Sequence, residues 1–290
     1  MQDTVTYLRS VRDQQPPAPA DPAEAMRLLR ERAELVAQLY PTPEDVLVEQ
    51  VDAGGVPADL LVPPGARRDA LLLYLHGGAY VAYSPRSHRE LASRLARAAG
   101  CVALVLDYRL APEHPWPAAV DDAVAAHDWA RQQGRVAVAG DSAGGGLALA
   151  LVQRLRAAGQ PAPAALALLS PWTDLSLTDL ADVDDPTLDA ARLSSAARAY
   201  AGDQDLAHPE LSPVHADLSG LPPLHVEVGT GELLLPDSRR LVDAARRAGA
   251  SATLHEGEGL PHVWQVFATT PEATASTDRV GAFLRSALAR

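Results

Sequence analysis

The sequence predicts an α/β protein in which a mostly parallel sheet carries helices on both faces. Short runs that are apolar at every position, such as "ALLLYL", "VALVL" and "LALL", alternate with longer amphipathic segments rich in Ala and Leu. Continuous apolar strands, unlike alternating ones, are typical of parallel sheets buried on both sides. The chain has 290 residues, 47% of them hydrophobic, which is enough apolar mass for one large domain or two small ones.

The N-terminal part is expected to contain one long helix after a connector. The helix is predicted over residues 21–40, with Asp21 as its N-cap and Pro22 at its first position. Its apolar face is expected to contain Leu28, Leu35 and Leu39. The Pro-rich stretch "QQPPAPADP" that leads into it is expected to be a connector.

From residue 46 onward, strand and helix signals follow each other to the C-terminus. A hairpin is predicted over 46–62, and later strands at 69–75, 102–108, 135–140, 164–170, 222–229 and 251–257. The helices are expected at 88–100, 118–134, 143–159 and 236–250, and from 271 to the end. No strand is predicted between Trp172 and Leu221, where short helices are expected instead. An insertion of this kind after a strand is a candidate lid over the carboxyl ends of the strands.

The formal net charge of −12 argues against two classes of partner. Nucleic acids and anionic lipid surfaces are bound by clustered Lys and Arg, so neither is expected. Cys101 is the single cysteine, which excludes an internal disulfide, and its run "GCVALVLDY" predicts a buried strand. The N-terminus lacks the pattern of a signal peptide, and no apolar run approaches the roughly 20 residues that span a bilayer. A cytoplasmic protein is therefore expected.

The pentapeptide "GDSAG", residues 140–144, lies where a predicted strand ends and a helix begins. Small flanking residues let the chain turn sharply and hold the Ser142 hydroxyl clear of the backbone, as in a nucleophile elbow. The turn also directs the following N–H groups and the helix N-terminus at an oxyanion formed there. An ordinary Gly-rich turn is the alternative, and a phosphate loop is excluded because no Gly-Lys-Ser/Thr follows. The surrounding strand and helix favour a nucleophile.

The stretch "YLHGGAYVAYSP" indicates a second catalytic feature at the end of the strand 69–75. The small residues Gly77, Gly78 and Ala79 leave backbone N–H groups free to face a developing oxyanion. This is the partner half of the oxyanion hole in hydrolases with a strand–turn–helix nucleophile. His76 is expected to organise this loop by hydrogen bonding, and a role as general base is the alternative.

A serine nucleophile needs a base, and His262 is the favoured candidate. It follows a Gly-Leu-Pro loop at the carboxyl end of the last strand, from which a side chain can reach a central serine. Three other histidines lie inside predicted helices or strands and are expected to be structural: His127, His225 and His255. The rest are expected in loops with no assigned role: His88, His114, His208 and His215.

The base in turn needs a carboxylate that orients it. Glu232 stands just past the strand 222–229, in the chain order serine, acid, histidine that this kind of hydrolase uses. Asp237 is the alternative, although its place before a helix also suits a simple N-cap. No metal site is expected, because the chain has no HExxH, no Cys/His cluster and no EF-hand spacing.

Several blocks in order resemble the hormone-sensitive-lipase-like (bacterial family IV) esterases of the α/β-hydrolase superfamily. "LHGGAYVAYSPRSHR" is similar to the family's HGGG block, "LDYRLAPEHPWPAAVDD" to its DYRLAPExPFPA block, and "GDSAGG" to its nucleophile motif. "LSPVHADLSGLPPLHVEVG" and "LPHVWQVF" are similar to its C-terminal half. The resemblance runs from Val46 to the C-terminus.

This resemblance implies an α/β-hydrolase fold with an eight-stranded sheet and a helical cap. The N-terminal cap helices would occupy residues 1–45 and the catalytic domain 46–290, with a cap insertion near 173–210. The implied reaction is the hydrolysis of carboxylic esters without a cofactor. By position, the implied nucleophile, acid and base are Ser142, Glu232 and His262. The implied oxyanion hole uses the N–H groups of Gly78, Ala79 and Ala143, with Gly77 shaping the turn.

Two positions depart from the family's pattern. Many members have Asp in a "DPLRD" string where this chain has "ELLLPD", with Glu232 aligned to the first Asp. Ala79 replaces the last glycine of the HGGG block, and Ala serves there unless the position requires a positive φ. The charges of Asp107, Arg109 and Glu113 are interpreted as a structural network that supports the "HGG" loop.

The expected function is a serine carboxylesterase acting on short to medium acyl esters. A lactone hydrolase or an amidase is the nearest alternative, and a non-catalytic ligand receptor is another, opposed by the presence of His262. With 2 Phe in the chain, an aliphatic acyl pocket is expected, with pocket residues Tyr80, Asp141, Trp172 and Trp264. The expected partner is a small ester or lactone, and a homodimer is left open.

Overall fold

The sheet of this protein has the strand order β1-β2-β4-β3-β5-β6-β7-β8. The structure is a computed structural model and describes residues 1–14 and 21–289. Strand β2 is antiparallel to β1 and to β4, and the remaining neighbours are parallel. The strands are β1 Leu47–Asp52, β2 Pro57–Val62, β3 Arg67–Leu75, β4 Cys101–Leu106, β5 Arg135–Asp141, β6 Leu166–Leu169, β7 Leu224–Gly229 and β8 Ala252–Gly257. The predicted mostly parallel, eight-stranded sheet is confirmed.

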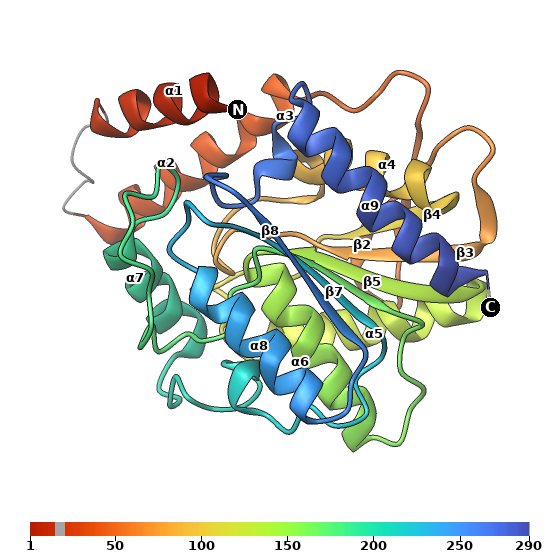
Figure 1. Ribbon diagram of the computed structural model, residues 1–290. Coiled ribbons are helices and arrows are strands. Elements are labelled where there is room, and N and C mark those ends of the chain that lie inside the picture. The colour runs from red at the N-terminus through yellow and green to blue at the C-terminus, as the bar shows by residue number, and fades with distance from the viewer. Residues whose placement is uncertain (15–20, 290) are drawn as a thin grey trace.

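Helices cover both faces of this sheet, as Figure 1 shows. On one face lie α4 (Pro85–Ala99) and α9 (Pro271–Leu288), and on the other lie α5 (Ala118–Gln133), α6 (Ala143–Ala157) and α8 (Leu235–Arg247). The other helices are α1 (Gln2–Asp13), α2 (Pro22–Glu34), α3 (Val36–Leu39) and α7 (Ala190–Ala201), with short 3₁₀ turns η1 (Pro213–His215) and η2 (Trp264–Val266).

Two separate hydrophobic cores result from the alternation of side chains along the strands. In β3, Leu71, Leu73 and Leu75 belong to the core beneath α5, α6 and α8. Leu72 and Tyr74 belong to the core beneath α4 and α9. Successive side chains of a strand point to opposite faces, so a strand between two helical layers must be apolar at every position. The continuous apolar runs of the sequence follow directly from this arrangement.

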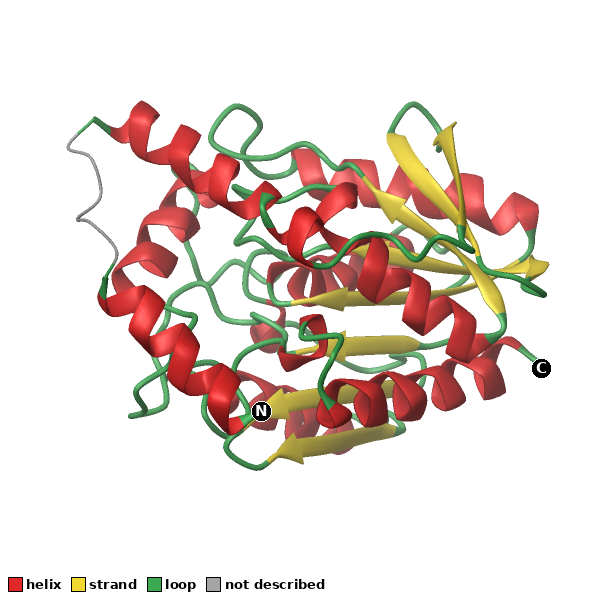
Figure 2. Ribbon diagram, turned by 90° about the horizontal axis from the view of Figure 1, so that it is seen from above, coloured by secondary structure: helices red, strands yellow, loops and turns green. Residues whose placement is uncertain are grey.

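The parallel strands direct their carboxyl ends toward one side of the molecule. Figure 2 shows the arrowheads pointing to the side on which α1 and α2 lie, and Figure 1 shows α7 on this same side. Helix α7 belongs to residues 173–210, which we call the insertion. No strand occurs in this fully described stretch, as predicted. The side chains that follow β3, β5, β7 and β8 therefore come together beside the insertion.

The N-terminal prediction was wrong in two respects. The expected helix over residues 21–40 is divided at Leu35 into α2 and α3, and Leu35 and Leu39 are 48% and 72% exposed instead of buried. At the division the Leu35 N–H donates to Arg32 O, a tighter i→i−3 turn that breaks the 3.6-residue period. Helix α1 was not predicted as a separate element. The Pro-rich connector falls largely on residues 15–20, outside the described part of the chain.

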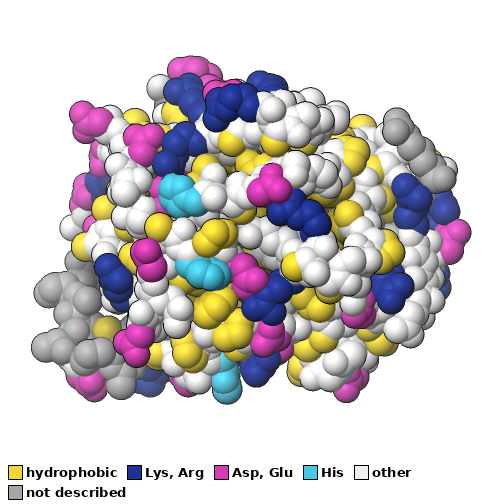
Figure 3. Space-filling model, turned by 90° about the horizontal axis from the view of Figure 1, so that it is seen from below, with side chains coloured by type: hydrophobic (Ala, Val, Ile, Leu, Met, Phe, Trp, Pro, Cys, Tyr) yellow, Lys and Arg dark blue, Asp and Glu magenta, His cyan; other side chains and the backbone are white. Residues whose placement is uncertain are grey.

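Charged side chains of both signs are mixed on the face shown in Figure 3. Among the ion pairs of the described residues, Arg154 of α6 pairs with Glu210 and with Asp121. Within residues 1–14 and 21–289, no helix is both long enough and apolar enough to cross a bilayer.

Candidate active site

Ser142 stands on a sharp turn between β5 and α6. Its backbone has φ 51° and ψ −120°, which is a strained conformation for a residue with a side chain. The turn is held by the Ser142 N–H donating to Leu169 O at 2.8 Å, and by Ser142 O accepting from the Trp172 N–H at 2.9 Å. Ser142 itself is 6% exposed. The sharp strand-to-helix turn predicted at Ser142 is thus present.

The flanking glycines are required by space. A Cβ on Gly144 would lie 1.9 Å from Leu75 O, and one on Gly140 would lie 2.4 Å from Gly144 O. Both contacts are with backbone, which cannot move away without distorting the sheet. The "GxSxG" spacing therefore results from the packing of the elbow against the end of β3.

The loop after β3 lies beside this elbow with unused backbone donors. Within the described residues, the N–H groups of Gly78, Ala79 and Ala143 donate to no protein acceptor. Gly78 has φ 113°, and a Cβ there would lie 2.2 Å from Ala82 O. Ala79 has φ 54° and Tyr80 φ 64°, so position 79 does adopt a positive φ, and alanine is strained there. Three free donors next to a serine suit the binding of an oxyanion.

A buried carboxylate holds this loop from below. Asp141 Oδ1 accepts from the Gly77 N–H at 3.0 Å and from Tyr74 Oη at 2.7 Å, and it lies 3.4 Å from His88 Nε2. Burial alone would raise the pKa of Asp141, but His88 and the hydroxyl of Tyr74 outweigh it and the pKa is lowered. Asp141, expected among the pocket residues, is directed into this network. Tyr74 and His88 were missed, and His88 lies in α4, not in a loop.

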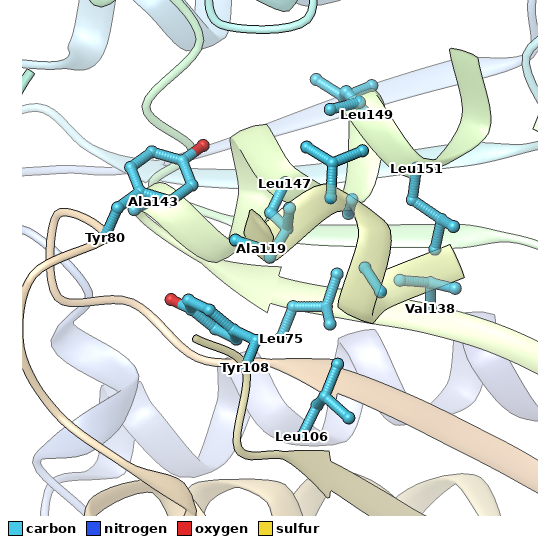
Figure 4. Packing of buried hydrophobic residues seen from close by; sticks show 14 of the residues in the cluster. Leu75, Tyr80, Leu106, Tyr108, Ala119, Val138, Ala143, Leu147, Leu149 and Leu151 are labelled. Atoms are coloured by element: carbon cyan, nitrogen blue, oxygen red, sulfur yellow. The ribbon is translucent and has the colours of Figure 1, made fainter. Parts of the chain in front are cut away.

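His76 organises the same loop, as expected. Its Nδ1 donates to Gly77 O at 2.7 Å, its ring stacks on Tyr108 at 4.3 Å, and Tyr108 Oη donates to His76 O. Burial and the neighbouring His88 lower the pKa of His76 to about 3. Figure 4 shows Tyr80 and Tyr108 at the edge of the core near Leu75 and Ala143. His76 is therefore a neutral, fixed side chain and not a base.

His262 and Glu232 meet at the carboxyl edge of the sheet. The His262 Nδ1–H donates to Glu232 Oε1 at 2.9 Å, and the two side chains are 8% and 0% exposed. This hydrogen bond leaves the Nε2 lone pair as the site that can take a proton. Burial would lower the pKa of His262, but the carboxylates of Glu232, Asp185 and Asp141 outweigh burial and raise the pKa. Among the described residues, no hydrogen bond joins the Ser142 hydroxyl to His262; such contacts are often long in unliganded enzymes.

Ser170 connects the acid to the histidine loop and was not predicted. Its Oγ donates to Glu232 Oε2 at 2.6 Å and accepts from the Val263 N–H at 3.1 Å. The Gly229 N–H donates to the same Glu232 oxygen at 2.9 Å. Ser170 immediately follows Leu169, which binds the Ser142 N–H. One short segment after β6 thus links the serine elbow, the carboxylate and the histidine loop.

Asp237, the alternative acid, is directed away from His262. Its Oδ2 accepts from the N–H groups of Thr173 and Asp174, and its Oδ1 accepts from Arg240. Burial raises the pKa of Asp237 to about 6. This carboxylate therefore ties the start of the insertion to α8.

The three aromatic side chains expected as pocket walls are buried. Tyr80, Trp172 and Trp264 are each at most 1% exposed. The ring of Tyr80 stacks on Tyr200 of α7 with 3.7 Å between centroids and 2° between planes. Trp172 Nε1 donates to Asp174 O at 3.0 Å. Tyr80 and Tyr200 thus connect the loop of the free N–H groups to the insertion.

The network expected of Asp107, Arg109 and Glu113 reaches the loop after β3 through Glu113, because its partner Arg30 donates from Nε to Val81 O at 2.9 Å. Arg109 forms a bidentate pair with Asp122 of α5, and Glu113 pairs with Arg30 of α2. The Asp107 side chain is exposed, although its N–H donates to Pro57 O. Tyr108, the residue between the first two, makes a direct contact with the loop. This buried phenol was not predicted, and it adds to the support that Glu113 gives the loop through Arg30.

The chain is similar to known hydrolases over most of its length. A family model described as an alpha/beta hydrolase fold matches residues 72–266. An acetyl-hydrolase of Streptomyces hygroscopicus is 44% identical over 275 residues, which cover 91% of this chain and 90% of that protein. A crystal structure of an esterase from the bacterial hormone-sensitive lipase (HSL) family is 42% identical with a TM-score of 0.91, covering 99% of this chain and 97% of the other. A hormone-sensitive lipase from a metagenome library is 34% identical with a TM-score of 0.93, covering 99% and 98%.

Proposed function

The chain belongs to the bacterial hormone-sensitive lipase family of α/β hydrolases and is a serine carboxylesterase, and we propose that Ser142, Glu232 and His262 carry out its reaction. The observation that carries this assignment is the 2.9 Å hydrogen bond from His262 Nδ1 to Glu232 at the same sheet edge as the Ser142 elbow. It supplies a buried base of defined tautomer, and Asp237 offers no comparable contact.

In the proposed mechanism, His262 Nε2 takes the proton of the Ser142 hydroxyl as Oγ forms a bond to the ester carbonyl carbon. The resulting oxyanion accepts hydrogen bonds from the N–H groups of Gly78, Ala79 and Ala143. Removal of one such donor typically costs about 3 kcal/mol in transition-state stabilisation. The bond to the alcohol then breaks, and His262 gives its proton to the leaving oxygen. Water attacks the acyl-enzyme in the same way, releasing the acid and restoring the Ser142 hydroxyl.

Glu232 has two tasks in this mechanism. Its hydrogen bond fixes the imidazole tautomer, and its charge stabilises the imidazolium that forms in each transition state. Because the pKa of His262 is raised above its ordinary value of 6.5, the base is protonated and inactive in acid. We therefore expect kcat/KM to rise with pH through a midpoint above 6.5.

We further propose that the helices before β1 and the insertion form a cap over this site and limit the acyl group to short and medium lengths. The aliphatic composition of the chain and the name of the Streptomyces relative, an acetyl-hydrolase, support a short acyl chain. Lactone hydrolysis and a receptor function are not favoured by the relatives, which include esterases.

The test combines covalent labelling with turnover. An organophosphate should add one adduct mass on Ser142, and p-nitrophenyl butyrate should be hydrolysed faster than a long-chain ester emulsion. Ser142→Ala should lose both the adduct and the turnover, with a fall in kcat of about 10⁴-fold or more. An adduct on another residue, or unchanged turnover by Ser142→Ala, would refute the assignment.

A further inference from the structure

We propose that Asp185, on the insertion, is a positioning residue of the esterase reaction: its carboxylate holds the turn that carries Glu232 and so keeps Glu232 directed at His262. This inference rests on the proposed function of Glu232 and His262. It concerns a residue that has no direct contact with the reacting atoms and that no sequence motif indicated.

The contact that carries the inference is made to the peptide next to the acid. Asp185 Oδ2 accepts from the Leu233 N–H at 2.9 Å, and the Ala181 N–H donates to Leu233 O at 2.9 Å. The Leu233 N–H belongs to the planar peptide unit that joins Glu232 to Leu233. The insertion therefore holds both polar backbone groups of the residue that follows Glu232.

Asp185 is itself held rigidly. Its Oδ1 accepts from Thr187 N at 2.8 Å, Thr187 Oγ1 at 2.8 Å and Leu188 N at 3.0 Å. The residue is 4% exposed, so both carboxylate oxygens accept their hydrogen bonds largely away from water. A carboxylate that accepts from several fixed donors keeps one orientation, and that orientation sets the place of the Leu233 N–H.

Helix α1 also contacts the segment that contains Asp184 and Asp185. Arg12 Nη1 donates to Asp185 O at 2.8 Å and to Asp184 Oδ1 at 2.6 Å, and Arg9 Nη2 donates to Asp184 O at 3.1 Å. These arginines are exposed enough for each pair to be weak by itself. Together they form a continuous polar path from α1 through Asp185 and Leu233 to Glu232 and His262.

The charge of Asp185 also acts on the base. The acidic groups that face His262 are Glu232, which accepts its hydrogen bond, Asp185 from the insertion and Asp141 from β5; all three raise its pKa against the effect of burial. Removal of one of these charges favours the neutral imidazole. A role confined to folding the insertion would leave the acid limb of the pH profile where it is, so this limb distinguishes the two roles.

The experiment compares Asp185→Ala and Asp185→Asn with Asp189→Asn. Asp189 is an exposed carboxylate on the same insertion that caps α7 through the Arg192 N–H. Rates are expressed per active site titrated with an organophosphate, which corrects for unfolded protein. We expect Asp185→Ala to lower kcat by about ten- to a hundredfold, since small misplacements of catalytic groups cost that much. Asp185→Asn should lose less, because its amide oxygen can still accept from the Leu233 N–H.

Both Asp185 variants should also move the acid midpoint of kcat/KM to lower pH by about half a unit or more, because a negative charge near the imidazolium is lost. Asp189→Asn should change neither quantity. Asp185 variants that label normally and keep the wild-type kcat within twofold and the wild-type midpoint would overturn this inference alone. A wild-type protein without an adduct on Ser142 and without ester turnover would overturn the proposed function and this inference together.

Discussion

The two halves of the candidate active site are held in place by different means. In the serine half, with Ser142 and the loop of Gly78 and Ala79, backbone packs so closely against backbone that a Cβ on a glycine would collide with a carbonyl oxygen, and Asp141 and Tyr108 add hydrogen bonds to the loop. The half that carries Glu232 and His262 is positioned by side chains from distant segments, which donate to or accept from the loops that carry them.

This difference sets what each half tolerates. A substitution that adds atoms at a close backbone contact has a large effect, because backbone in a sheet cannot move away. The expected result is a loss of folded protein. A hydrogen-bonded arrangement fails gradually, because water or a neighbouring group can replace part of a lost bond, and its failure appears first as loss of rate. The following substitutions test this contrast.

Glu232→Gln is expected to have the largest effect on rate. The amide keeps the size of the side chain but removes the charge that stabilises the His262 imidazolium, so kcat for p-nitrophenyl butyrate should fall by about 10³- to 10⁴-fold. Circular dichroism should show an intact fold. Asp237→Asn is the matched control and should keep kcat within tenfold. The reverse pattern would identify Asp237 as the acid.

Gly144→Ala is expected to affect the serine half by lowering the stability of the folded protein. Its new Cβ would lie 1.9 Å from Leu75 O, so the free energy of unfolding should fall by about 3 kcal/mol or more, as overpacking against rigid backbone does. Urea denaturation measures the change. Gly145→Ala, whose nearest contact is the Pro171 Cβ at 2.7 Å, should cost less. Equal and small costs for both would contradict the steric account.

Ser170→Ala removes a donor to Glu232 and an acceptor for the Val263 N–H. We expect a stability loss of about 1–3 kcal/mol, because buried partners are left unpaired, and a fall in kcat of about tenfold. Ser93→Ala provides the control: the Ser93 hydroxyl is buried and has no partner in the described residues. That control should leave both quantities nearly unchanged, and a similar loss in the two variants would count against the role of Ser170.

Ala79→Gly is expected to have the smallest effect, and in the stabilising direction. Glycine relieves the strain at φ 54°, so the free energy of unfolding should rise by up to about 1 kcal/mol. Ala82→Gly in the same loop, where φ is not positive, should instead destabilise. Thermal melts of the two variants should thus shift in opposite directions, and a shift in the same direction would argue against strain at position 79.

The serine half could be predicted from sequence because its constraints act on residue types. Gly78, Gly140 and Gly144 are required where backbone approaches this closely, and Gly77 where the Asp141 carboxylate does, and such requirements leave a local pattern. The apolar strands follow from burial on two faces in the same way. Glu232 was preferred to Asp237 because it stands just past the strand end, whereas Asp237 also suited a simple N-cap, and the hydrogen bond to His262 agrees with that preference.

The supports of the acid and histidine loops left no such pattern. Ser170 acts through hydrogen bonds to segments 62 and 93 residues away, and Asp185 acts through a hydrogen bond to a segment 48 residues away. Any small hydroxyl or carboxylate in a loop looks the same in sequence. Helix α1 has no buried residue, so its packing leaves no apolar stripe to detect. The positive φ of Ala79 could not be predicted, because an alanine in a sequence does not indicate a left-handed conformation as a glycine does.

The stacked pair of Tyr80 and Tyr200 bears on attempts to change the selectivity of this enzyme. One ring belongs to the loop of the free N–H groups and the other to α7, in contact at 3.7 Å between centroids. A segment grafted from a relative in place of the insertion would remove one ring and leave the other without its partner. In libraries made by recombining relatives, the residues at positions 80 and 200 should therefore be exchanged together or not at all.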